Sequence, residues 1–417
     1  MKKITKLTNL VILLSCSFFI TSTFAFSQEE KPSPTFGHTF VTVADGNDTL
    51  ILLFGGDNGA KIVINELWAY NEDNSEWEEE ELDNPPPRRS HAAVEHNNKM
   101  IVLFGEGQSG LLSDIWEYDP SNNSWEELPS GGTNVPAARK SFTASVMDNK
   151  VIIVGGETDS GPSDEVWAYD IANNTWEEKE SYMGAVAGHA ACTYNDMLYI
   201  FGGSDPPSFR NDIWSFSLQT NSWSYVDAGG RIPAESAYFG YTSSGPYFYI
   251  VGGNNDSKFV FGQFFVLNLD DLSWTQLPNI PALTNLAATF VGDNMGNGEL
   301  YTFGGLDAQN VTTDIFLCYH TNNGTWITVN TLQLEDNKQI MDIYPNPFNN
   351  EITISGTSIV NTVYIEIYDI LGKLVFDQSY KATEIKIDLT EIESGTYILK
   401  IKDGNGSIIR ADKVVKQ

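Results

Sequence analysis

A pattern of about fifty residues recurs six times along this 417-residue chain. Each copy contains an apolar run that ends in glycine, and these glycines follow one another at intervals of 47 to 52 residues. Five copies have a glycine pair, whereas the second has Gly105, with Glu106 in place of the second glycine. A repeat of this length predicts an array of similar units rather than a single unrepeated core. The five pairs are Gly55-Gly56, Gly155-Gly156, Gly202-Gly203, Gly252-Gly253 and Gly304-Gly305.

Each glycine is followed by the same order of residue types. A variable loop leads to an acidic or amide residue, and an aromatic residue comes two positions later. A turn rich in Asn, Asp and Ser then leads to a second aromatic residue, nine positions after the first in five repeats and ten in the last. Two strands joined by a hairpin fit this order. The acidic or amide residues are Glu66, Asp114, Glu165, Asp212, Gln263 and Asp314; the first aromatic residues are Trp68, Trp116, Trp167, Trp214, Phe265 and Phe316; the second are Trp77, Trp125, Trp176, Trp223, Trp274 and Trp326.

Two further strand-like runs precede each glycine. In the second repeat they are 91–94 and 100–104, and Asn97-Asn98-Lys99 between them is a turn signal. Four short strands per repeat predict a four-stranded sheet, which can bury both faces only when like sheets pack radially. We therefore expect an all-β propeller of six blades, each built from consecutive residues. In this interpretation Trp116 and Trp125 pack between sheets and form no binding site.

The repeat has a recognisable relative. The glycine pair, the Tyr-Asp step at Tyr118-Asp119 and Tyr169-Asp170, and the Trp that follows resemble the kelch repeat. The resemblance implies a six-bladed kelch β-propeller over residues 36–334. The last two repeats are looser, with Leu267-Asn268 and Cys318-Tyr319 where the Tyr-Asp step is expected.

The N-terminus is typical of a secretory signal peptide. Three lysines lie within the first six residues, an apolar run covers 10–20, and small residues at 23–25 offer a cleavage site. We assign residues 1–25 to this peptide. The apolar run is too short for a membrane-spanning helix, so no integral membrane segment is expected after cleavage.

The C-terminus differs from the repeats. Residues 335–341 are a polar linker, and 342–417 alternate apolar residues with glycine turns, which predicts a small immunoglobulin-like β-sandwich. The module also resembles the C-terminal sorting domain of the type IX secretion system of Bacteroidetes. That resemblance implies recognition by the secretion machinery, transport across the outer membrane, and a secreted or cell-surface location. The residues that carry it include Tyr344, Pro345, Asn346, Pro347, Gly372, Lys373 and Gly395.

Charge and motifs exclude several function classes. The net charge is −31, whereas nucleic-acid binding needs a basic surface and anionic lipids repel an acidic protein. No zinc-hydrolase, P-loop, dinucleotide-binding or nucleophile-elbow motif occurs, so we expect no cofactor and no metal. His38, His91 and His189 recur at one place in three repeats, which favours a structural role. Cys192 and Cys318 are expected to be buried without forming a disulfide.

Candidate ligand-binding residues must lie where the repeats differ. Arg89, Arg139 and Arg231 open inner strands and could bind a carboxylate at the central channel, or pair with acids such as Asp114 or Glu165. The variable loops add Phe209, Arg210 and Phe259, which suit glycan stacking or protein docking.

Two functions are open at this point. The first is a secreted or cell-surface recognition module that binds a protein or glycan, and the lack of catalytic motifs favours it. The second is a carbohydrate-active enzyme of the sugar-epimerase or mutarotase type at the channel. Arginines held in pairs within a blade would count against the second.

Overall fold

The computed structural model describes residues 31–329 except 47, 81, 131, 133, 206 and 256–258. In the C-terminal part it describes residues 341–344, 347–356, 363–369, 373–381, 384–390, 392–402 and 408–417. The predicted signal peptide and residues 335–340 of the predicted linker lie outside the described residues, as do Pro345, Asn346 and Gly372 of the sorting motif.

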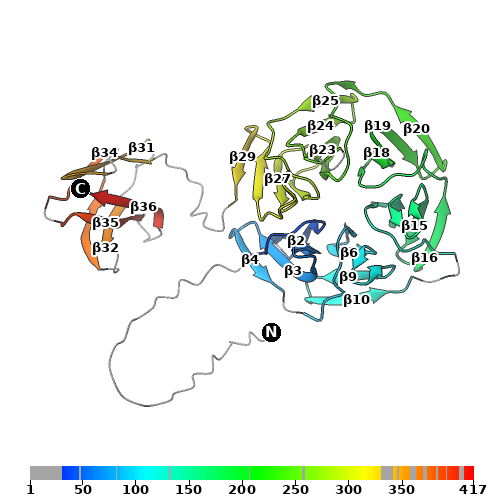
Figure 1. Cartoon of the computed structure of the whole chain (residues 1–417), viewed down its shortest axis with the longest axis horizontal. Helices are drawn as coiled ribbons and strands as arrows, with labels where there is room; N and C mark the ends of the chain where they lie inside the picture. Colours follow the sequence, from blue (N-terminus) through cyan, green and yellow to red (C-terminus); the bar gives the residue numbers. More distant parts are fainter. Residues whose placement is uncertain are drawn as a thin grey trace, which may run out of the picture.

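Six antiparallel sheets of the described residues are arranged around a central axis (Figure 1), and this confirms the predicted all-β propeller. Each sheet is built from consecutive strands. A two-residue strand, β21 (Gly229–Gly230), joins the edge of blade five, and short ribbons β7–β8 (Glu106–Gly107, Gly110–Leu111) and β13–β14 (Glu157–Thr158, Gly161–Pro162) extend two loops. The blades are β1 (Thr39–Asp45), β2 (Asp48–Asp57), β3 (Val63–Asn71), β4 (Glu76–Glu79); β5 (Ala92–His96), β6 (Lys99–Leu103), β9 (Ile115–Asp119), β10 (Ser124–Leu128); β11 (Thr143–Met147), β12 (Lys150–Val154), β15 (Val166–Asp170), β16 (Thr175–Lys179); β17 (Ala190–Tyr194), β18 (Met197–Asp205), β19 (Ser208–Ser217), β20 (Ser222–Val226); β22 (Gly240–Ser244), β23 (Tyr247–Val251), β24 (Phe264–Asn268), β25 (Ser273–Gln276); and β26 (Ala287–Gly292), β27 (Gly298–Phe303), β28 (Phe316–His320), β29 (Thr325–Thr328).

A ring of six main-chain hydrogen bonds closes the propeller. One residue at the start of each blade donates its N–H to the carbonyl of the matching residue in the preceding blade, at 2.6–3.0 Å. The bond from Gly37 to Asn285 joins blade one to blade six, so the ring closes without a shared blade. All six residues have a left-handed φ between 50° and 65°. They are Gly37, Ser90, Ser141, Gly188, Tyr238 and Asn285.

The second aromatic residue of a repeat packs between blades. Trp125 of blade two lies against Phe54 of blade one, with ring centroids 5.0 Å apart. The matching contacts join neighbouring blades elsewhere, and the one between Trp77 and Phe303 lies across the closing seam, at 5.7 Å. Aromatic pairs of this kind contribute about 0.5–1.5 kcal/mol beyond their burial. The prediction that Trp125 packs between sheets is therefore confirmed.

The register predicted for the second repeat is wrong by one residue. Gly105 donates its N–H to the carbonyl of Arg139 in the connection to the next blade. In blade three the second glycine of the pair, Gly156, makes the matching hydrogen bond to Val186. Phe104, not Gly105, therefore occupies the first glycine position, and it has a φ of 55° there. A bulky residue at positive φ is strained. Its ring still reaches Trp176, 5.8 Å away, and fills the gap between blades.

The register predicted for the last repeat is also wrong by one residue. The N–H of Gly304 donates to the main-chain carbonyl of Ile315. In blades two and three the carbonyl of the residue at the acidic position accepts the matching hydrogen bond. Ile315 therefore replaces the acid, and Asp314 does not. Leu317, not Phe316, stands at the first aromatic position.

The Tyr-Asp step of this blade shifts accordingly. Tyr319 pairs with Trp326 across β28 and β29, as Tyr169 pairs with Trp176 in blade three. Tyr319-His320 therefore fills the step, and the expected Cys318-Tyr319 does not. Strand pairing decides this register, and the residue types alone do not reveal it.

The C-terminal part forms two antiparallel sheets of three and four strands. Their shared core contains Ile354, Ile365, Ile387 and Leu399, each fully buried. Lys416 near the end of the chain is buried and donates to three loop carbonyls at 2.6–3.0 Å. The predicted β-sandwich is confirmed, and its immunoglobulin-like character stays a prediction. The sheets are β30 (Met341–Tyr344), β31 (Glu351–Gly356), β34 (Glu384–Asp388), and β33 (Leu374–Tyr380), β32 (Val363–Asp369), β35 (Gly395–Lys402), β36 (Ile408–Lys416).

Candidate functional site

The antiparallel order of strands gives the propeller two different faces. Turns between the first and second strands and between the third and fourth strands emerge on one face. Loops between the second and third strands and the connections between blades emerge on the other, which we call the loop face. Loops held by a rigid scaffold are where binding residues commonly lie.

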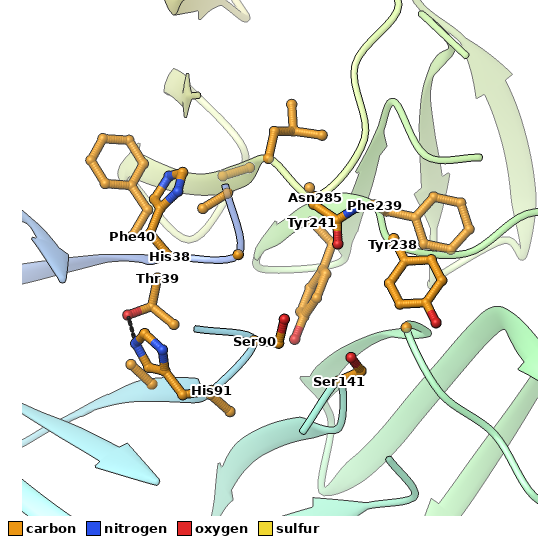
Figure 2. Close-up of a pocket in the computed structure, with 18 of the residues that line it drawn as sticks. His38, Thr39, Phe40, Ser90, His91, Ser141, Tyr238, Phe239, Tyr241 and Asn285 are labelled. Carbon is orange, nitrogen blue, oxygen red and sulfur yellow. Dashed lines mark hydrogen bonds between the residues drawn. The ribbon is translucent and has the colours of Figure 1, made fainter. Parts of the chain in front are cut away.

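A cavity of about 170 Å³ lies in the channel beside the ring of hydrogen bonds, and all six blades line it. Figure 2 shows His38, His91 and Tyr241 among the side chains around it. The Nε2 atom of His91 lies 2.9 Å from the hydroxyl of Thr39 in the preceding blade.

The recurring histidines are buried at one structural position. Each follows a residue of the ring, and His189 makes the same inter-blade contact as His91, to Thr143 at 2.7 Å. Burial lowers the pKa of His38 and of His189 to about 3, and that of His91 well below its usual value. All three imidazoles are therefore neutral at pH 7. Their shared place supports the structural role predicted from the sequence.

A second set of six contacts lies beside the ring, towards the loop face. In each blade the residue just before the ring residue pairs in an antiparallel bridge with the residue after the glycine pair, or after Phe104-Gly105 in blade two. Blades one to three contribute mostly charged side chains here, whereas blades four to six contribute none. The bridges are Phe36 with Asp57, Arg89 with Glu106, Lys140 with Glu157, Ala187 with Ser204, Ala237 with Asn254, and Thr284 with Leu306.

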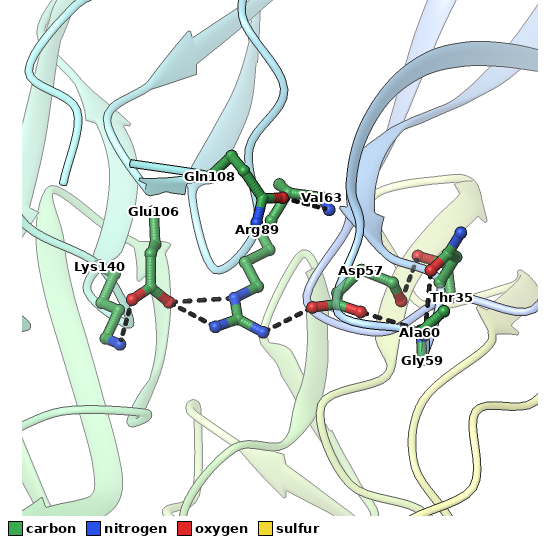
Figure 3. A network of polar contacts seen from close by, with 10 residues as sticks. Thr35, Asp57, Gly59, Ala60, Val63, Arg89, Glu106, Gln108 and Lys140 are labelled. Atoms are coloured by element: carbon green, nitrogen blue, oxygen red, sulfur yellow. Dashed lines mark hydrogen bonds and ion pairs between the residues drawn. The ribbon is translucent and has the colours of Figure 1, made fainter. Parts of the chain in front are cut away.

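The charged side chains form one continuous network (Figure 3). Arg89 binds Asp57 at 2.6 Å and Glu106 at 2.9 Å, so it links blades one and two. Lys140 lies 3.0 Å from Glu106 and 3.9 Å from Glu157. Burial raises the pKa of Glu106, but the hydrogen bonds and charges of Lys140 and Arg89 outweigh it and leave that pKa below its usual value. Glu106 is therefore ionised at neutral pH.

The three candidate arginines do not form one site. Arg89 belongs to the network. Arg139 is fully buried and donates to Glu165 at 2.5 Å and to the carbonyl of Gly155 at 2.9 Å. Arg231 is exposed in the connection before β22. A role of these residues in ligand binding stays a prediction.

Sequence reasoning missed Arg88. Its guanidinium is fully buried and binds both carboxylate oxygens of Asp114, at 2.8 and 2.9 Å. It takes in blade two the place that Arg139 takes in blade three. The sequence signal for Arg88 was its position next to Arg89. Neighbouring residues of an extended segment point to opposite sides, so only one of the two arginines can face the channel.

The predicted loop residues differ in exposure. Phe259 in the loop of blade five is 64% exposed. Phe209 in blade four is half-buried. Arg210 lies 3.3 Å from Asp205 and 5.5 Å from the ring centre of Tyr182, so its charge is engaged.

Exposed large hydrophobic residues gather on the loop face. Six described residues of this kind, 41–64% exposed, lie there, in loops or connections that together cover all the blades. Among the described residues, Met295 is the one on the opposite face, and Tyr225 lies on an outer strand. Apolar patches of this type commonly mark interaction sites. The six are Ile62, Val135, Met183, Ile232, Phe259 and Val311.

Comparison with known families decides the class of this propeller. The KLHDC2/KLHL20/DRC7 Kelch-repeats domain matches residues 6–186 and 179–296, which is more than half of the chain. The chain belongs to the kelch-repeat family. The predicted kelch-type propeller is thereby confirmed.

Several known proteins match parts of this kelch chain. Tip elongation aberrant protein 3 of Schizosaccharomyces pombe is 28% identical over 37% of this chain and 16% of its own length. Acyl-CoA-binding domain-containing protein 4 of Arabidopsis thaliana is 25% identical over 37% of this chain and 23% of its own. Human Kelch-like protein 25 is 32% identical over 16% of this chain and 12% of its own. The kelch chain thus matches less than a quarter of the length of these relatives.

The C-terminal part of the kelch protein matches a second family. The Secretion system C-terminal sorting domain covers residues 342–417. The kelch protein therefore carries the signal for type IX secretion, which leads to the cell surface or exterior. In the part of the chain that the structure describes, no helical stretch has the length and hydropathy of a membrane span.

The buried histidines should make the kelch propeller less stable in mild acid. Because the folded pKa of His38 is lowered to about 3, the unfolded chain takes up a proton near its usual pKa and the folded chain does not. Stability is therefore lost as pH falls below about 6.5, by roughly 2 kcal/mol for His38 between about pH 7 and pH 5. His38→Phe, which copies Phe142 and Phe239 at the same position, should remove one such loss. Guanidinium unfolding at both pH values would measure it, and an unchanged difference between them would contradict the assignment.

Proposed function

We propose that this protein is a secreted recognition module whose loop face binds a protein partner outside the cell. The observation that carries the proposal is the gathering of exposed hydrophobic side chains on that face around the ion-pair network of Arg89 and Lys140. Exposed apolar side chains on one face can serve as the anchors of a protein interface, and the charged residues beside them can supply its polar contacts. The kelch family and the sorting domain support a binding module that works at the surface or exterior.

The loops of blades five, six and one supply the strongest part of this surface. Phe259, Val311 and Ile62 are its three most exposed large hydrophobic residues, at 53–64%. The loop of blade one lies against Thr312 of blade six, so these two loops form one continuous surface. Neighbouring apolar side chains on a rigid frame can bind with little loss of conformational freedom.

Charge favours a basic partner. The chain has a net charge of −31. The ion-pair network towards the loop face has three carboxylates and two basic groups, Arg89 and Lys140. Opposite charge speeds association and disfavours acidic partners. Binding should therefore weaken as salt concentration rises.

The side chains on the loop face support protein binding over glycan binding or catalysis. Sugar stacking needs open aromatic faces, and of the two loop aromatics predicted for it Phe209 is half-buried. Carboxylates already occupy Arg89 and Arg139, two of the three first suspects for a sugar-processing site, and the third, Arg231, is exposed in the connection before β22. Neither Arg89 nor Arg139 is free to take a substrate carboxylate without breaking an ion pair.

The test compares two sets of surface substitutions. The triple variant Ile62→Ser, Phe259→Ser, Val311→Ser removes the apolar residues of the loop face. The control Met295→Ser, Tyr225→Ser removes exposed apolar residues elsewhere. Partners would be captured by cross-linking on intact cells and their affinity measured with purified protein. The loop-face variant should bind about tenfold more weakly or worse, because central apolar anchors usually contribute more than 1 kcal/mol each.

Folding must be shown to be unchanged, by circular dichroism and by Tm, for both variants. Equal binding by wild type, triple variant and control would contradict the proposal. Binding to a glycan array that survives the triple substitution would replace a protein partner with a glycan.

A further inference from the structure

The ring of blades closes at the seam between blade six and blade one. Within the residues that the structure describes, no strand is shared across it, so it depends on packing and hydrogen bonds between residues from the two ends of the propeller. Its buried part is an aromatic cluster that includes Phe40, Trp77, Phe303 and Phe316. Tyr301 and Cys318 also belong to this cluster, and polar side chains meet them at its edge.

The group at this edge contains metal-binding residue types on two strands of blade six. Glu299 and His320 lie opposite each other on β27 and β28, with a carboxylate oxygen 2.6 Å from Nδ1. The thiol of Cys318 lies 3.3 Å from the other oxygen of Glu299. One thiol, one imidazole and one carboxylate atom lie within 4.8 Å of one another. The thiol is buried, whereas Glu299 and His320 are about a third and a quarter exposed, so an ion could enter from solvent.

Blade one adds a second carboxylate. The hydroxyl of Tyr301 lies 2.5 Å from Glu299 and 3.1 Å from Glu72, which follows β3. One phenol oxygen thus lies within hydrogen-bond distance of two carboxylates from opposite sides of the seam. Groups that orient ligands in this way are typical of the surroundings of bound metals.

The repeat itself does not require these residues. Strand register places Cys318 where blades one and three have Ala69 and Ala168, and His320 where blade one has Asn71. These other blades form the same sheet without a thiol or an imidazole. The combination in blade six therefore needs an explanation other than the fold.

We propose that the seam binds a zinc ion through Cys318 Sγ, His320 Nδ1 and the carboxylate of Glu299, with Glu72 of blade one as fourth ligand. Zinc takes four ligands of sulfur, nitrogen and oxygen, whereas calcium and magnesium take oxygen ligands. The thiol loses its proton to solvent on binding, and the ion takes the place between Glu299 and His320. The four ligands join the two ends of the propeller.

Such an ion stabilises the closed ring. Its ligands come from two blades that are far apart in the sequence, and unfolding separates them. A ligand that binds only the folded chain raises its stability in proportion to the logarithm of the free concentration. Zinc should therefore raise the Tm of the protein, and a chelator should lower it.

The experiment uses the purified full-length exported protein, freed of metal by chelation. Zinc would be titrated against a competing chelator dye, and cobalt would be added to detect thiolate bonding by its absorption. Wild type should bind one equivalent and gain Tm. Cys318→Ala and His320→Asn copy residues of other blades, so they keep the sheet, and each should weaken binding about tenfold or more. Cys192→Ala, at the other buried free cysteine, is the control and should bind as wild type does.

Glu72→Gln tests the link across the seam. It should reduce both the affinity and the zinc-dependent gain in Tm, because one ligand from blade one is lost. The proposal is overturned if wild type binds no zinc, or if Cys318→Ala and His320→Asn bind it as wild type does. It is also overturned if these variants lower Tm while zinc leaves the Tm of wild type unchanged, since the group would then be a hydrogen-bonded contact only.

Discussion

Removal of residues 342–417 should leave the secreted and surface-bound fractions of the protein at background and keep the propeller within the cell envelope. The sorting domain is a separate β-sandwich with its own core, so its loss removes the export signal without opening the aromatic core of any blade. Immunoblotting of medium, surface and periplasmic fractions would measure the distribution. Normal surface or medium levels of the truncated chain would show that export does not depend on this domain.

Two controls separate lost export from lost folding. The truncated chain should keep its circular dichroism spectrum and its resistance to protease, because the six blades and the ring of main-chain bonds lie within residues 31–329. Residues 342–417 fused to a periplasmic reporter should carry that reporter out of the cell. A fusion that stays in the periplasm would mean that the propeller also contributes to recognition.

The architecture could be predicted because its signals are local and repeated. A left-handed turn, an aromatic wedge and a hairpin each need certain residue types within a few positions, and six copies average out the exceptions. Single copies could not be aligned in this way. Phe104 replaces a glycine, and Leu317 replaces an aromatic residue, so the residue type points to the wrong position. Only the pairing of neighbouring strands corrects it.

The candidate site was harder to predict because it depends on direction and on distant contacts. Arg88 and Arg89 are adjacent and chemically identical. Arg88 is nevertheless buried with Asp114, whereas Arg89 is partly exposed and belongs to the ion-pair network towards the loop face. Exposure of Ile62 or Val311 depends on how far each loop stands out from its blade. Glu72 and Tyr301 meet across 229 positions of sequence. No short motif contains such information.

Asp114→Ile should cost about 3–5 kcal/mol of unfolding free energy, because it leaves the fully buried guanidinium of Arg88 without its counter-charge. Main-chain carbonyls of Pro86 and Phe104 still accept from Arg88, but they do not neutralise it. Trp116 also loses its acceptor, which lies 2.7 Å from the indole N–H. A fall in Tm of roughly 5–10 °C should follow in calorimetry.

Blade six has two apolar residues at the positions of this ion pair, and they provide a matched control. In blade six, Leu283 and Ile315 occupy the positions of Arg88 and Asp114. The double variant Arg88→Leu, Asp114→Ile copies them and removes both charges, so it should recover most of the loss, since buried ion pairs add little to stability over apolar pairs. A double variant as unstable as Asp114→Ile would mean that the pair contributes through shape and hydrogen bonds, with charge balance secondary. Arg88 would then have been retained for packing, and the acidic position of the repeat would owe its recurrence to the indole of Trp116.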